Sequence, residues 1–153
     1  MKPTTLIAFS LCLVGCGHKK DPSDEQVLVA EAELAGSTCH DEFGFTEHLK
    51  PPSTPRSRAW LKQALQPIVD LHMDLAMADE DREAPPHVRG LLDPPLDNPD
   101  EYRRTKADWI AKAKQPYDKA LAACQLLWVG KADPLKLEKI QTRLSYEFDQ
   151  DHP

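Results

Sequence analysis

The sequence lacks the short motifs that identify several large classes of protein. It contains no G-x-S-x-G nucleophile elbow, no phosphate-binding P-loop and no G-x-G-x-x-G dinucleotide fingerprint. It also has no C-x-x-C-H site for the attachment of haem. These absences remove the usual signatures of hydrolases, nucleotide-binding enzymes and c-type cytochromes. We therefore expect no catalytic residue, no bound metal and no cofactor.

Basic charge is scarce as well. The 153 residues include 19 Lys and Arg against 25 Asp and Glu, and the formal net charge is −6 at pH 7. A nucleic-acid-binding surface needs clustered cations that displace counterions, so we expect no nucleic-acid partner. The chain also lacks convincing runs of alternating apolar and polar residues. Strands are therefore not expected.

No apolar run is long enough to cross a bilayer. The run from Leu6 to Val14 has nine residues, whereas a membrane-spanning helix needs about 20. It follows Lys2 and leads into Leu13-Val14-Gly15-Cys16. This layout is that of a secretory signal, and it resembles the lipobox of bacterial prolipoproteins. The resemblance implies export, cleavage before Cys16, and acylation of its sulfur and new amino group by palmitate-type chains.

The lipobox divides the chain into three parts. We assign residues 1–15 to a signal peptide, 16–22 to a lipidated tether and 23–153 to a folded domain. Gly17 follows the lipidated cysteine, where an Asp would resemble the inner-membrane retention signal of enteric lipoproteins. We therefore expect the protein on the periplasmic face of the envelope, held by its lipid in the outer membrane.

Only two of the four cysteines are expected to remain available in the mature chain. Cys12 leaves with the signal peptide and Cys16 carries the lipid, so Cys39 and Cys124 remain. Disulfides persist in oxidising compartments such as the periplasm. We predict a Cys39–Cys124 disulfide. The alternative is a nucleophilic Cys39 beside His40, which would need a base positioned from elsewhere in the fold.

Apolar spacing of three and four residues predicts four amphipathic helices. Gly36 and Gly130 are expected to end the first and third helices, and Pro67 and Pro116 to kink the second and third. Residues 40–53 and 83–97 are expected to be loops. The fold class is therefore all-α, a single domain of about four helices in a kinked bundle. The helix starts are Asp21-Pro22, Thr54-Pro55, Asn98-Pro99 and Asp133-Pro134.

Two further patterns concern the helix faces. Met73 and Met77 are expected to fill the core, as methionines on apolar helices usually do. Trp60 and Trp109 each lie seven residues before the proline inside their helix. This echo indicates either a duplicated helical unit or a coincidence of a few identities. The fourth helix is expected to turn Leu137, Ile140, Leu144 and Phe148 inward.

Histidines and carboxylates gather in two places. A zinc site needs three or four converging ligands of these types. The helical spacing of two histidines four residues apart is absent around His72, so we interpret these residues as solvated acids and hydrogen-bonded histidines. A metal protein or an enzyme that uses them is the alternative. The two groups are His40, Asp41, Glu42, Glu47 and His48, and His72 with Asp74 and residues 79–81.

The remaining candidate site is a surface. Leu91, Leu92 and Leu96 lie in a Pro-rich segment that follows Asp79-Glu80-Asp81. Apolar residues bordered by acids are typical of a protein-binding site, in which the apolar part supplies affinity and the charges steer association. The alternative is that the leucines cover the domain's own helices.

In size, anchor, cysteine pair and helicity the chain resembles two groups of lipoproteins. Immunity lipoproteins neutralise secreted antibacterial effectors, and pilotin lipoproteins escort outer-membrane components. The resemblance implies a non-catalytic lipoprotein that binds a periplasmic protein partner. We expect an immunity protein, with a pilotin-like or other envelope-assembly role as the alternative.

Overall fold

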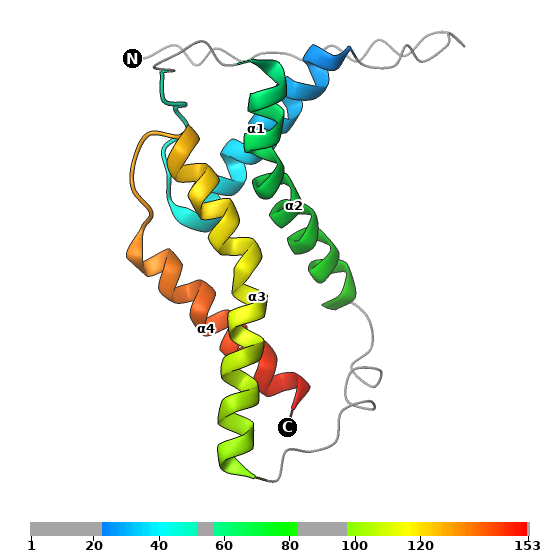
Figure 1. Ribbon diagram of the computed structural model, residues 1–153, viewed down its shortest axis with the longest axis vertical. Helices are drawn as coiled ribbons and strands as arrows, with labels where there is room; N and C mark the ends of the chain where they lie inside the picture. The colour runs from blue at the N-terminus through cyan, green and yellow to red at the C-terminus, as the bar shows by residue number, and fades with distance from the viewer. Residues whose placement is uncertain (1–22, 52–56, 83–97, 153) are drawn as a thin grey trace, which may run out of the picture.

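The computed structural model describes residues 23–51, 57–82 and 98–152, without the side chains of residues 79–82. The described part contains four helices and no strand, so the predicted all-α single domain is confirmed (Figure 1). None of these helices has the combination of length and hydropathy required to cross a membrane. The helices are α1 (Asp24–Phe43), α2 (Arg58–Arg82), α3 (Pro99–Leu127) and α4 (Pro134–Asp151).

Polar side chains cap the helix starts. Ser23 and Gln26 form a reciprocal capping box at α1, with hydrogen bonds of 3.3 and 3.0 Å. Ser57 Oγ accepts from Trp60 N at 3.1 Å at the start of α2. Asn98 and Asp133 cap α3 and α4 as predicted, each accepting from the amide two residues ahead. The predicted starts at Asp21 and Thr54 lie outside the described residues.

The prediction that Gly36 ends the first helix is wrong. α1 continues to Phe43, and Gly36 lies inside it against the indole of Trp128. A Cβ at Gly36 would lie 3.4 Å from Trp128 Nε1. An added Cβ would be at ordinary contact distance, so space does not require glycine here. The helix continues because its packing against Trp128 outweighs the poor helix propensity of glycine.

Gly44 is the residue that ends α1. Its φ of 82° is left-handed, and its N–H donates to His40 O at 2.9 Å. A Cβ at Gly44 would lie 2.8 Å from Cβ of Asp133, the residue that caps α4. Asp133 N also donates to Phe43 O at 2.8 Å. The end of α1 and the start of α4 are therefore fixed to each other.

The segment after α1 is paired with the segment after α3. Thr46 N donates to Val129 O at 3.2 Å, Val129 N to His48 O at 2.9 Å, and Lys50 N to Leu127 O at 2.7 Å. Leu49 and Trp128 form an antiparallel bridge. α3 consequently ends at Leu127 rather than at Gly130, because Trp128 is already extended. Within the expected loop at 40–53, residues 40–43 are helical and residues 46–50 are hydrogen-bonded to residues 127–129, while residues 52 and 53 lie outside the described residues.

The Cys39–Cys124 pair joins α1 to α3 at disulfide distance, with 5.7 Å between the Cα atoms. Both cysteines are fully buried. The largest side chains around this end of the bundle are also removed from solvent. They are Phe43, Phe45, Leu127 and Trp128.

α2, α3 and α4 complete the bundle. α2 and α3 continue through Pro67 and Pro116, and the kinks expected there stay predictions. α2 packs against α1 and α3, and α4 crosses α3 obliquely (Figure 1). α4 buries Ile140, Leu144 and Phe148 as predicted, but Leu137 is 36% exposed, so its predicted inward position is wrong.

Candidate functional site

The predicted partner-binding residues lie at the border of the described structure. Leu91, Leu92 and Leu96 are outside the described residues, as is Cys16. Asp79, Glu80 and Asp81 belong to the last turns of α2 through their backbone. These three acidic residues therefore lie at the end of α2, and the described residues next to them form the candidate site.

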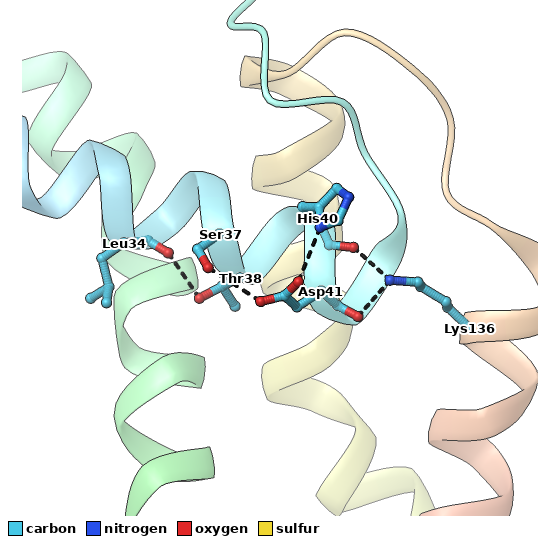
Figure 2. A network of polar contacts seen from close by, with 6 residues as sticks. All are labelled: Leu34, Ser37, Thr38, His40, Asp41 and Lys136. Atoms are coloured by element: carbon cyan, nitrogen blue, oxygen red, sulfur yellow. Dashed lines mark hydrogen bonds and ion pairs between the residues drawn. The ribbon is translucent and has the colours of Figure 1, made fainter. Parts of the chain in front are cut away.

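The first histidine-carboxylate group is a helix end. Asp41 accepts a hydrogen bond from Ser37 at 3.2 Å and contacts His40 Nδ1 at 3.0 Å (Figure 2). The pKa of Asp41 is lowered, first by the His40 hydrogen bond and further by Ser37 and the charge of Lys136, against a smaller opposing effect of burial.

Lys136 binds the backbone carbonyls at this end of α1. Its Nζ reaches from α4 and donates to the carbonyls of His40 at 2.7 Å and Asp41 at 2.8 Å (Figure 2). A cation at these carbonyls complements the negative end of the α1 dipole. The arrangement attaches α4 to α1.

Two other members of the predicted groups, His72 and Glu42, have partners elsewhere in the bundle. His72 Nδ1 lies 3.2 Å from the buried Thr38 Oγ1, which donates to Leu34 O at 3.0 Å. Glu42 pairs with Arg143 of α4. Within residues 23–51, 57–82 and 98–152, no three His, Cys, Asp or Glu side chains converge in a way that could hold a metal ion.

The described structure contains a cleft between α2, α3 and α4, with a volume of about 280 Å³. It lies directly beside the acidic end of α2, because Ala78 is one of its walls. We name it the Arg143 cleft. Its apolar lining is Leu71, Leu75, Ala78, Trp109, Ala113, Pro116 and Leu144, and its polar lining is Glu42, Asp74, Tyr117, Arg143 and Glu147.

Arg143 is held in the cleft by two hydrogen bonds. One terminal nitrogen donates to Glu42 Oε2 at 3.0 Å and to Tyr117 Oη at 2.9 Å, and the guanidinium lies 5.4 Å from the Tyr117 ring centroid. Burial acts to lower the pKa of Arg143, but Tyr117 and the nearby carboxylates outweigh it and the net shift is upward. Burial is the main cause that raises the pKa of Tyr117. Arg143 is therefore a fixed cation whose charge is paired with Glu42, and its buried Nε has no hydrogen-bond partner in the described part.

Apolar surface lies next to the cleft on α2. Met73 and Met77 are 54% and 60% exposed, so the prediction that they fill the core is wrong. They are four residues apart and therefore share one face of the helix, with Asp74 beside them. We name these three residues the methionine face.

The two echoing tryptophans have different surroundings. Trp109 is partly buried, lines the Arg143 cleft, and lies 5.8 Å from the Phe148 ring centroid. Trp60 is 37% exposed near the start of α2. The similar sequence around the two tryptophans therefore does not give them similar surroundings.

Sequence reasoning missed Arg143 and Glu147 as site residues. The available signal is their position on α4, where they alternate with the buried Ile140, Leu144 and Phe148 at neighbouring helical positions. Charged residues so close to an apolar stripe are candidates for the border of a cleft. The sequence shows Asp74 only as one acidic residue among several. Its position beside the cleft depends on how α2 packs against α4.

Comparisons of the chain with known protein families, with curated proteins and with solved structures find no match.

Proposed function

We propose that the chain is a lipid-anchored envelope protein that binds a protein partner without catalysing a reaction. The proposed anchor is Cys16, and the proposed location is the periplasmic face of the outer membrane. The buried Cys39–Cys124 pair supports this location, because disulfides persist in oxidising compartments.

The methionine face is the observation that carries the binding role. Met73 and Met77 are more than half exposed although they belong to a helix that packs in the bundle. Methionine is flexible and polarisable, and it is common at surfaces that adapt to a partner. Asp74 of this face also lines the Arg143 cleft, so exposed apolar side chains and a carboxylate lie side by side there.

A photo-crosslinking experiment tests the binding role. A photoreactive amino acid at Met73 or Met77 should give a discrete adduct with one envelope protein in living cells. The same group at Leu135, which is 66% exposed near the start of α4, is the matched control. Equal adducts from all three positions, or adducts from none, would contradict the proposal.

The anchor is tested separately by fractionation. Wild type should be found in the membrane fraction, and Cys16→Ala should leave it because it lacks the acylated residue. A Cys16→Ala protein that is processed and still sediments with membranes would contradict the lipobox.

Within this class we propose an immunity role against a secreted antibacterial effector. Deletion of the gene should make cells sensitive to contact with otherwise identical wild-type cells, and plasmid expression should restore resistance. Loss of an assembled outer-membrane complex without contact sensitivity would favour the pilotin-like role instead.

A further inference from the structure

The Arg143 cleft has the size of a site for one side chain. Its volume is about 280 Å³, while pockets for drug-sized ligands run from roughly 300 to 1,000 Å³. Most of its lining is apolar and comes from three helices that the bundle holds in place. A long aliphatic stem can therefore lie along it.

The charges of the cleft favour a cation. Its lining carries three carboxylates, on Glu42, Asp74 and Glu147, and one guanidinium, on Arg143. Arg143 is already hydrogen-bonded to Glu42 and Tyr117. An anion that entered would meet the carboxylates of Asp74 and Glu147, and the charge of Arg143 is already paired with Glu42, while its buried Nε has no hydrogen-bond partner among the described residues.

Asp74 is the carboxylate placed to receive that cation. It belongs to the methionine face of α2 and also lines the cleft, and its side chain is exposed. It makes no hydrogen bond or ion pair with any residue of the described part. Asp70, one turn earlier, differs because it accepts a hydrogen bond from Gln66 at 2.7 Å.

We propose that the Arg143 cleft receives a lysine or arginine side chain of the protein partner. The aliphatic stem lies on Leu71, Leu75 and Trp109, and the cationic end pairs with Asp74. This inference rests on the proposed function, since it assigns the chemistry by which the methionine face and its cleft recognise the partner. Apolar contact supplies affinity and the acidic border selects the sign of charge.

The three tryptophans provide the test. Each indole N–H gives its own NMR signal, and only Trp109 lines the cleft. Titration of the purified protein with n-pentylammonium, which has the stem and charge of lysine, should shift the Trp109 signal and leave those of Trp60 and Trp128 in place. Pentanol and pentanoate have the same stem without the positive charge, and they should bind about tenfold more weakly or not at all.

Two variants identify the carboxylate. Asp74→Asn should weaken n-pentylammonium binding by about threefold to fivefold, the range of an exposed ion pair. Asp70→Asn is the matched control and should leave binding unchanged. Added salt should weaken binding to wild type and have less effect on Asp74→Asn. Equal binding of pentanol and n-pentylammonium, or no shift at Trp109, would overturn the inference.

The crosslinking experiment separates this inference from the proposed function. Adducts from Met77 that persist unchanged in Asp74→Asn would show a partner that does not use the cleft, so the function would stand and the inference would fail. Charge-selective binding of n-pentylammonium without any Met77 adduct would contradict the partner and therefore both proposals. Adducts that weaken in Asp74→Asn but not in Asp70→Asn would support both.

Discussion

The two ends of the bundle differ in what joins their helices. At one end, which we name the tied end, the buried cysteine pair and backbone hydrogen bonds between residues 46–50 and 127–129 join the segments around Phe43, Phe45 and Trp128, which are at most 1% exposed. At the cleft end, α2, α3 and α4 meet through side chains around the Arg143 cleft, and Met73 and Met77 are more than half exposed. Both ends bury some large apolar side chains and expose others, since Val129 is 41% exposed at the tied end and Phe148 is fully buried at the cleft end. The comparison therefore teaches that covalent and backbone links, rather than apolar burial, distinguish the tied end.

The largest expected effect is the loss of Trp128 from the tied end. Trp128→Ala should lower the free energy of unfolding by about 3–5 kcal/mol, because it empties the space between Gly36 and the segment after α1. Urea unfolding measures this change. Trp60→Ala is the comparison variant and should cost about 1–2 kcal/mol, since Trp60 keeps 37% of its surface exposed whereas Trp128 keeps 1%. Similar losses in both variants would break the comparison.

Removal of the disulfide should be the next largest effect. The double variant Cys39→Ala/Cys124→Ala should lose about 2–4 kcal/mol, because the unfolded chain is no longer constrained across a separation of 85 residues. Wild type treated with a reductant should approach the same stability. Thiol labelling of denatured, unreduced wild type should find neither cysteine free, and full labelling of either one would refute the bond.

Replacement of two glycines at the tied end by alanine should affect the stability of the protein differently. Gly44→Ala should destabilise by about 1–3 kcal/mol, because alanine disfavours a φ of 82° and its Cβ would press on Asp133. Gly36→Ala should be neutral or stabilise by about 0.5–1 kcal/mol, because Gly36 is helical and its added Cβ would make ordinary contact with Trp128. Thermal melts of the two variants give the signs. A destabilised Gly36→Ala would show tighter packing around Trp128 than these distances imply.

The smallest expected effect concerns a polar link at the cleft end. Asp149 of α4 accepts hydrogen bonds from Lys106 and Tyr102 of α3, and these bonds, Lys106 first, lower the pKa of Asp149. Its contribution to stability is therefore complete above the ordinary Asp pKa of 3.8 and is lost as the pH falls through the lowered value.

This pH dependence can be measured by thermal melts between pH 2 and 6. The loss of stability on acidification should be shallower in Asp149→Asn than in wild type, because the variant has no carboxyl group to protonate. Parallel curves for the two proteins would show that this link does not contribute to holding α3 and α4 together at the cleft end.

Most of the fold could be predicted because it depends on patterns of neighbouring residues and on a count of cysteines. Apolar spacing gave the four helices, and the positions of Asn98 and Asp133 gave two of the caps. The cysteine pair followed from the expectation that Cys12 leaves with a signal peptide and Cys16 carries a lipid, which leaves Cys39 and Cys124. Each of these inferences needs only neighbouring residues or a count.

The errors arose where distant residues decide the outcome. Gly36 looks like a helix end until Trp128 is placed against it. Met73 and Met77 look like core residues because their spacing fits, but the position of α4 decides whether anything covers them. The Arg143 cleft has the same origin, since three helices supply its lining. Such features depend on helix packing, which the local pattern does not specify.

The covalent ring closed by Cys39 and Cys124 leaves α4 outside it, because α4 begins at Pro134. α4 is therefore held to the ring by noncovalent contacts, namely the packing of Ile140, Leu144 and Phe148 and the hydrogen bonds of Lys136. Since Arg143 and Glu147 belong to α4, one wall of the Arg143 cleft lies outside the covalent constraint and can separate from the other walls while the ring stays closed.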